Sequence, residues 1–189
     1  MEIAKYLFNL VTIKGRFLGQ AFQAMDTSGT SKIIFTRHQA NAIEDDVFRL
    51  KPYLGKTRTY LRKSLEFWEE GGREFDVAEI PLVRHSGGIL VAKPSSSGMS
   101  LEMPSSRLYP AIAQWRRMRM YRLEVGEVGK GWACFHAWTD EAKPDLGNSG
   151  APLLSEEKLV VAVASAKVVD PNKPYAGAAE QIAWRFNTR

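Results

Sequence analysis

The sequence predicts an all-β protein built from two small antiparallel barrels, and three observations carry this prediction. Short apolar runs alternate with polar residues over most of the chain, which is typical of half-buried strands. Turn-forming residues separate these runs at short intervals. A Pro- and Ser-rich stretch divides the chain near its middle. We therefore expect an N-terminal barrel over 1–93, an interdomain linker over 94–106 and a C-terminal barrel over 107–189.

The N-terminal half begins with three expected strands and a short helix. The strands are expected at residues 10–14, 17–25 and 32–36. Asp26–Ser31 has the composition of a turn between the second strand and the third. Asn41, with Glu44 three residues later, matches a capping box, so a short helix is expected to run towards Leu50.

The segment that follows is ambiguous. Residues 51–73 interleave basic residues with aromatic and aliphatic ones, a pattern compatible with two strands or with a helix. Residues 77–83 read as a strand that Pro81 ends or interrupts, because proline cannot donate to a strand ladder. Beyond the linker, strands are expected at residues 117–125, 131–138, 152–154 and 158–168.

Length and composition indicate an ordinary globular protein. The 189 residues are 44% hydrophobic and 25% charged, with a formal net charge of +5, which suits one large domain or two small ones. The single cysteine, Cys134, excludes an intrachain disulfide and favours a reducing compartment. No apolar run reaches the roughly 18 residues of a membrane span, and residues 1–15 do not resemble a signal peptide.

One serine lies in a glycine-rich loop suited to nucleophilic chemistry. Ser149 stands between two glycines in the stretch PDLGNSGAP, and a serine hydroxyl needs a base, oriented by an acid, to become a nucleophile. His38 is the candidate base because it follows an apolar strand, and Asp76 is the candidate acid because it opens one. A surface turn, a structural histidine and a strand-end aspartate are the plainer interpretations. Asp45 and Asp46 are competing acids, expected on an exposed helix face.

Three segments resemble the catalytic segments of the chymotrypsin-fold serine proteases. Residues 32–40, KIIFTRHQA, resemble the histidine segment, residues 75–80, FDVAEI, the aspartate segment, and residues 147–152, GNSGAP, the serine segment. The order His, Asp, Ser is also that of this family. Two departures are Arg37, where the family has a small residue, and Asn148, where secreted members carry an aspartate that pairs with a newly cut N-terminus.

The small size and the lack of disulfides resemble the virus-encoded branch of this family, the 3C-like serine proteases of positive-strand RNA virus polyproteins. The resemblance implies two antiparallel six-stranded β-barrels with the active site in the cleft between them. It implies a polypeptide substrate, namely a viral polyprotein from which the enzyme also releases itself. It further implies host cell cytoplasm as the location and no cofactor or metal. A bacterial or organellar trypsin-like protease is the alternative within the same fold.

The resemblance also assigns roles to individual residues. Ser149 would attack the scissile carbonyl, His38 would take the proton of the hydroxyl, and Asp76 would orient the imidazole. The backbone N–H groups of Gly147 and Ser149 would form the oxyanion hole, where Gly147 avoids the hindrance of a Cβ. Gly150 would let neighbouring backbone pack closely behind the nucleophile.

The pocket for the substrate residue before the cut is implied to lie between the segment preceding the serine and a later strand. The expected lining residues are Lys143, Ala162, Ala164 and Ser165. Lys143 would favour an acidic substrate residue by charge pairing, or else it points into solvent, as most lysines do. The later strand is small and apolar, and it lacks the histidine that Gln- or Glu-specific viral relatives place there.

A basic stretch after the linker suggests a second kind of partner. Arg116, Arg117, Arg119 and Arg122 stand among aromatic residues, and weak RNA binding is one interpretation, because each phosphate contact adds salt-dependent affinity. A solvated strand face is the plainer one. The chain is therefore a serine endopeptidase or a nucleic-acid- or protein-binding module on a protease-like fold. The complete set of nucleophile, base and acid favours the endopeptidase.

Overall fold

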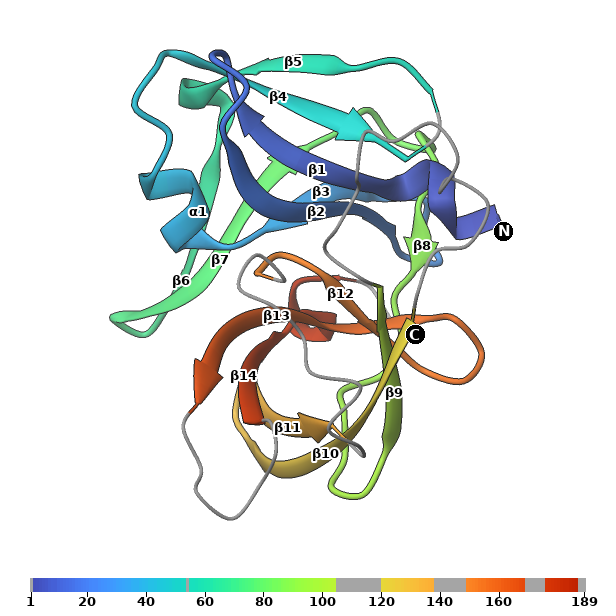
Figure 1. The fold of residues 1–189 in the computed structure, drawn as a ribbon. Helices are drawn as coiled ribbons and strands as arrows, with labels where there is room; N and C mark the ends of the chain where they lie inside the picture. Colours follow the sequence, from blue (N-terminus) through green and yellow to red (C-terminus); the bar gives the residue numbers. More distant parts are fainter. Residues whose placement is uncertain (1, 54, 105–119, 138–148, 169–175, 187–189) are drawn as a thin grey trace.

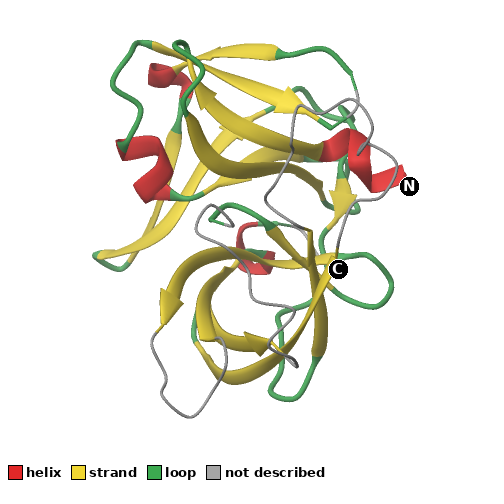
Figure 2. Cartoon of the chain, viewed as in Figure 1, coloured by secondary structure: helices red, strands yellow, loops and turns green. Residues whose placement is uncertain are grey.

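The computed structural model describes residues 2–53, 55–104, 120–137, 149–168 and 176–186. Nearly all elements in this part of the chain are β-strands, and they form two sheets that lie one above the other in Figure 1. Figure 2 shows that the few helical segments are short. The predicted two-barrel all-β class is therefore confirmed. Within the described ranges, no helix is long and apolar enough to cross a membrane.

The N-terminal sheet contains eight strands. They are β1 (Leu7–Thr12), β2 (Phe17–Met25), β3 (Ser31–Phe35), β4 (Val47–Pro52), β5 (Arg58–Leu61), β6 (Glu66–Glu70), β7 (Arg73–Pro81) and β8 (Ile89–Leu90). Their hydrogen-bonded order is β5-β4-β1-β2-β3-β7-β6, and β8 pairs in parallel with β2. The ambiguous stretch 51–73 thus contributes two strands, β5 and β6, rather than a helix.

The expected helix towards Leu50 is wrong. This residue and Phe48 are buried on β4 and alternate with more exposed neighbours, which is a strand pattern. The helix lies earlier, as α1 (Arg37–Asn41), because Thr36 and Gln39 form a reciprocal capping box at its start. The other helical segments in the described ranges are short 3₁₀ turns, namely η1 (Glu2–Tyr6), η2 (Arg62–Ser64) and η4 (Ala183–Arg185).

The C-terminal sheet is a closed barrel of six strands. They are β9 (Ser100–Pro104), β10 (Met120–Gly129), β11 (Trp132–Ala137), β12 (Pro152–Leu154), β13 (Val160–Val168) and β14 (Ala176–Gln181). The expected linker over 94–106 needs correction, because β9 falls inside it and pairs with β10 and β12. Leu101 and Met103 on β9 are buried, so this Ser- and Pro-rich stretch still supplies alternating core residues.

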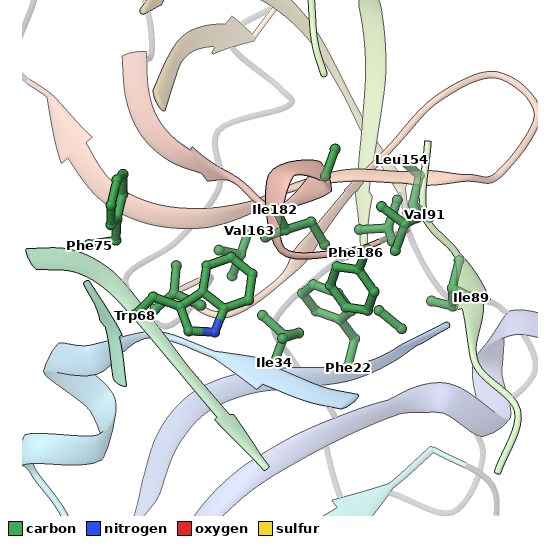
Figure 3. Packing of buried hydrophobic residues seen from close by; sticks show 14 of the residues in the cluster. Phe22, Ile34, Trp68, Phe75, Ile89, Val91, Leu154, Val163, Ile182 and Phe186 are labelled. Atoms are coloured by element: carbon green, nitrogen blue, oxygen red, sulfur yellow. The ribbon is translucent and has the colours of Figure 1, made fainter. Parts of the chain in front are cut away.

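Three apolar clusters hold the chain together. One contains Phe35 and Phe48 and lies within the N-terminal sheet, and a second contains Leu123 and Val161 and lies within the closed barrel. The third joins the two halves, because Trp68 and other N-terminal residues pack in it with residues from β12, β13 and η4 (Figure 3). Burying each large apolar side chain contributes about 1.5–3 kcal/mol. This shared cluster therefore fixes how the two sheets face each other.

Candidate active site

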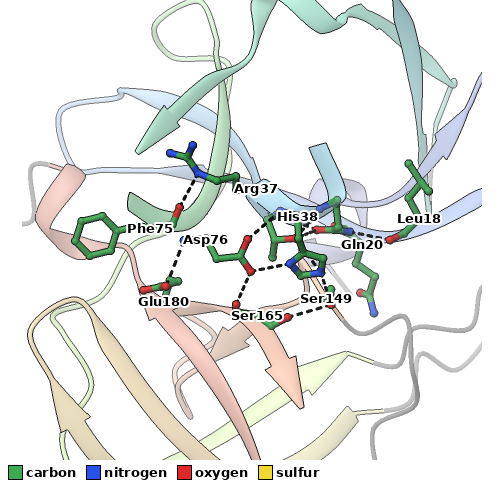
Figure 4. A network of polar contacts seen from close by, with 11 residues as sticks. Leu18, Gln20, Arg37, His38, Phe75, Asp76, Ser149, Ser165 and Glu180 are labelled. Atoms are coloured by element: carbon green, nitrogen blue, oxygen red, sulfur yellow. Dashed lines mark hydrogen bonds and ion pairs between the residues drawn. The ribbon is translucent and has the colours of Figure 1, made fainter. Parts of the chain in front are cut away.

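His38 and Asp76 face each other on neighbouring elements of the N-terminal half. His38 is the second residue of α1, and Asp76 lies on β7, which packs against that helix. The backbone N–H of His38 donates to Asp76 Oδ1 at 2.9 Å, and His38 Nδ1 lies 2.7 Å from Asp76 Oδ2. These two contacts hold the imidazole with its Nε2 atom turned away from the carboxylate (Figure 4).

Ser149 reaches the same imidazole from the other half of the chain. Its Oγ lies 3.1 Å from His38 Nε2, so Asp76, His38 and Ser149 form one hydrogen-bonded series (Figure 4). The carbonyl of Ser149 accepts the N–H of Gln20 on β2 at 2.9 Å. The structure thus brings together the three residues that the sequence predicts as nucleophile, base and acid.

Gly150 explains part of the glycine-rich pattern around the serine. It has a φ of +83°, and an added Cβ would lie 1.9 Å from the carbonyl oxygen of Gln20. Its own N–H donates to the carbonyl of Ala164 at 2.8 Å. A side chain at this position would push the serine loop away from β2, which agrees with the close backbone approach expected here. Gly147 lies outside the described residues.

The electrostatics favour an ionised Asp76. Burial raises the pKa of this half-buried carboxyl group, but hydrogen bonds from His38 and Ser165 outweigh burial and place the pKa below its usual value. The Ser165 hydroxyl lies 2.5 Å from Asp76 Oδ2. An ionised Asp76 accepts the Nδ1–H of His38, which leaves Nε2 as the acceptor that faces Ser149.

Ser165 has a contact that the sequence analysis did not foresee. It was expected to line the substrate pocket, whereas its hydroxyl donates to the carboxylate of Asp76. Its backbone carbonyl also accepts the Oγ–H of Ser149 at 3.1 Å. One residue of β13 therefore contacts both ends of the hydrogen-bonded series. No sequence signal distinguished this serine from its small neighbours on the strand.

Two of the residues predicted to line the substrate pocket are buried. Ala162 is fully buried and Ala164 nearly so, and both belong to the apolar interior of the closed barrel. Their role in a substrate pocket stays a prediction. Lys143 falls outside the described residues.

Arg37 was counted as a departure from the family pattern, and the structure shows where its side chain goes. Its Nε donates to the carbonyl of Phe75 at 3.1 Å, and its Nη2 donates to the carbonyl of Trp68 at 3.1 Å. The guanidinium also lies 4.7 Å from the centroid of the Phe67 ring. Arg37 therefore ties α1 to the β6–β7 hairpin, next to Asp76, and points away from Ser149 (Figure 4).

Glu180 is a second acidic group at the site, and the sequence analysis missed it. Its Oε1 accepts the backbone N–H of Asp76 at 3.3 Å. Burial raises the pKa of Glu180 above its usual value, against the lowering effects of that hydrogen bond and of Arg73, and the charge of Asp76 raises it further. The residue stands on β14, more than 100 positions away, so only the fold could reveal the pair.

The arginines predicted to bind RNA lie mostly outside the described residues. Arg116, Arg117 and Arg119 lie outside the described residues, and Arg122 is exposed on β10. Within the described ranges, no three His, Cys, Asp or Glu side chains gather into a group that could hold a metal ion.

Comparison with known proteins was informative at the level of structure. No protein-family model matches the chain, and no curated protein is similar to it in sequence. The human pathogenic astrovirus serine protease is similar in structure, with a TM-score of 0.59 and 16% identity over 95% of this chain and 90% of that one. The serine endoprotease from Yersinia pestis has a TM-score of 0.63 and 15% identity over 97% of this chain and 61% of that one.

A third similar structure is the MamO protease domain from Magnetospirillum magneticum. Its TM-score is 0.63, with 11% identity over 97% of this chain and 95% of that one. Viral and bacterial proteases thus share one architecture with this chain, and at such low identity the likeness concerns the fold. The chain therefore has the two-barrel fold of the chymotrypsin-like serine proteases.

Proposed function

We propose that this protein is a serine endopeptidase with Ser149 as nucleophile, His38 as general base and Asp76 as the orienting acid. One observation carries the proposal, namely the pair of contacts at 3.1 Å from Ser149 Oγ to His38 Nε2 and at 2.7 Å from His38 Nδ1 to Asp76 Oδ2. The first distance is within the range that proton transfer from a hydroxyl to an imidazole requires. The second is the hydrogen bond by which an acid orients the base.

The first half of the reaction forms an acyl-enzyme. Ser149 Oγ bonds to the scissile carbonyl carbon while its proton moves to His38 Nε2. The carbonyl π electrons move onto the oxygen, and the tetrahedral intermediate collapses as the C–N bond breaks. As that bond breaks, His38 gives its proton to the departing nitrogen, which leaves as a neutral amine. Asp76 stabilises the imidazolium throughout, because it stays ionised beside Nδ1.

The second half releases the acid product. Water enters in place of the amine, His38 takes one proton from it, and the resulting hydroxide attacks the ester carbonyl. The ester C–O bond to Ser149 breaks, and His38 returns the proton to Oγ. The backbone N–H groups of Gly147 and Ser149 are the proposed oxyanion hole, and losing one such donor typically costs about 10²–10³ in turnover.

The hydroxyl of Ser149 has two acceptors and only one proton. His38 Nε2 and the carbonyl of Ser165 both lie 3.1 Å from Oγ. Only the orientation towards Nε2 allows the proton to leave as the new bond forms. The carbonyl of Ser165 is therefore a competing acceptor, and attack requires the hydroxyl to be turned towards Nε2.

The proposed substrate is a polypeptide, and the proposed biological role is cleavage of a viral polyprotein, including self-release. The structural similarity to the astrovirus serine protease supports this role. Similarity to the Yersinia pestis enzyme supports a bacterial protease equally well at the level of the fold. Cleavage specificity separates them: a sharp sequence preference on both sides of the cut fits polyprotein processing, whereas degradation of any unfolded protein contradicts it.

The test compares the wild-type protein with the Ser149→Ala variant on an unbiased peptide library analysed by mass spectrometry. Labelling with a fluorophosphonate, which bonds an activated serine with loss of fluoride, is the second measurement. Cleavage and labelling by the wild type alone support the proposal. A folded wild type that neither cleaves nor becomes labelled overturns it, and a salt-dependent RNA titration would then test the binding-module alternative.

A further inference from the structure

We propose that Gln39 is a positioning residue that keeps His38 and Ser149 aligned across the two halves of the protein. The inference rests on the proposed function, because it concerns the same nucleophile and base. Gln39 follows His38 in α1, and its side chain is 2% exposed. A buried amide is costly unless its polar atoms are paired, so its partners reveal what it holds.

The oxygen of the Gln39 amide fixes the start of α1. Oε1 accepts the backbone N–H of Thr36 at 2.8 Å and the Thr36 hydroxyl at 2.8 Å. In return, the backbone N–H of Gln39 donates to Thr36 Oγ1 at 3.3 Å. A helix of only five residues has few hydrogen bonds of its own. This cap therefore determines where α1 begins and hence where His38, its second residue, points.

The nitrogen of the same amide binds the strand that holds the nucleophile loop. Nε2 donates to the carbonyl of Leu18 at 3.3 Å and to the carbonyl of Gln20 at 3.1 Å. The N–H of Gln20 in turn donates to the carbonyl of Ser149 at 2.9 Å. A continuous path of hydrogen bonds therefore runs from the helix of the base, through Gln39 and β2, to the nucleophile.

All four hydrogen bonds that a glutamine amide can make are used here. Backbone and hydroxyl donors face Oε1 and carbonyl acceptors face Nε2, so the orientation of the amide is determined by its partners. Two glycines make room for this amide. An added Cβ at Gly19 would lie 2.3 Å from Nε2, and one at Gly150 would lie 2.5 Å from Oε1.

The first test replaces the amide by an apolar side chain of similar size, Gln39→Leu. The matched control is Gln23→Leu on β2, since Gln23 is equally buried and its amide bonds the carbonyls of Ser86 and Gly87 and the guanidinium of Arg58. We expect Gln39→Leu to lower kcat about 10²-fold with KM little changed, as for a small misplacement of reacting groups. Gln23→Leu should keep the wild-type kcat. Equal loss of kcat per folded molecule in both variants would overturn the inference.

A second variant covers the case in which Gln39→Leu does not fold. In Gln39→Glu the ionised carboxylate still accepts from Thr36 but has no donor for Leu18 and Gln20, whereas the protonated form regains one donor. The ratio of kcat/KM for the variant to that of the wild type should therefore rise as the pH falls. A ratio that stays constant with pH contradicts a role for the Nε2 donor.

The third measurement does not depend on proteolysis. Hydrogen exchange of the backbone N–H of Gln20 reports its hydrogen bond to the carbonyl of Ser149. The Gln39→Leu variant should speed that exchange relative to Gln23→Leu. If the wild type shows neither cleavage nor labelling, the proposed endopeptidase activity is refuted. Hydrogen exchange then still tests the hydrogen-bonded link from Gln39 through Gln20 to Ser149. Unchanged protection of Gln20 in Gln39→Leu would refute the link itself.

Discussion

The backbone N–H of Asp76 donates a 3.3 Å hydrogen bond to Oε1 of Glu180, so a second carboxylate stands directly behind the proposed catalytic acid. The bond joins β7 of the N-terminal sheet to β14 of the closed barrel. Among the described residues, the other oxygen of Glu180 is buried and has no hydrogen-bond partner. An unpaired buried carboxylate oxygen costs stability when the group is ionised.

Replacing Glu180 by glutamine should stabilise the protein near neutral pH. Burial raises the pKa of Glu180 in the folded state above its ordinary value of 4.5, so the folded state binds the proton more tightly than the unfolded chain does. Stability from this group is therefore greatest at low pH and is lost as the pH rises through the raised pKa. Thermal melts of both proteins should differ at pH 7 and converge near pH 4. A lower melting temperature for Glu180→Gln at pH 7 would contradict this account.

Replacing Asp76 by asparagine should abolish most activity while the fold remains. An asparagine that presents its NH₂ group to His38 Nδ1 favours the wrong imidazole tautomer, and we expect kcat to fall by about 10⁴-fold. The control is Asp46→Asn, because Asp46 is exposed and was a competing acid in the sequence. Steady-state kinetics on one peptide substrate checks both. Loss of activity in the control and not in Asp76→Asn would exclude Asp76 as the acid.

Replacing Ser165 by alanine should weaken the site and change its response to acid. The variant loses one hydrogen bond to a charged carboxylate, and we expect kcat/KM to fall about tenfold. Because the pKa of Asp76 is lowered in the folded state, its contribution to stability is present above the ordinary value of 3.8 and is lost as the pH falls through the folded pKa.

As the pH rises from the lowered pKa of Asp76 in the folded state to its ordinary value of 3.8, the wild type gains stability. The Ser165→Ala variant should gain less over the same range. Chemical denaturation at several pH values measures the difference. Ser31→Ala is the control, since Ser31 is a buried serine whose hydroxyl has no hydrogen-bond partner among the described residues. Identical pH profiles for Ser165→Ala and the wild type would refute the role assigned to this hydroxyl.

Replacing Glu79 by glutamine should loosen the contact between the two halves. Glu79 is 1% exposed, and its carboxylate lies 3.0 Å from Lys32 Nζ and 3.3 Å from Arg185 Nη2, the latter in η4. It also accepts the Nε1–H of Trp68 at 3.0 Å. Loss of the charge-assisted bonds should lower the free energy of unfolding by about 2–3 kcal/mol, as measured by urea denaturation. The exposed neighbour Glu66→Gln should have no such effect, and equal losses in both would contradict the prediction.

The sequence was most informative where a short segment carries its own physical signature. For example, the pattern of apolar residues over 17–25 predicted a strand, and this segment forms β2. It was less informative where two signals competed. Asn41 and Glu44 match a capping box, yet Thr36 and Gln39 form the one that exists, because burial of Phe48 and Leu50 commits the following segment to β4. Local capping contributes less than strand pairing and core burial.

Which residues could act as nucleophile, base and acid was legible in the sequence by itself, because Ser149, His38 and Asp76 each stand in a distinctive local pattern. Their mutual distances were decided only by tertiary structure, through the apolar cluster that fixes one sheet against the other. The same holds for Glu180 and Gln39. No local sequence pattern marks these residues, but their polar atoms meet partners from distant strands. A sequence records the chemistry of each side chain, whereas which polar groups meet depends on how the two sheets pack.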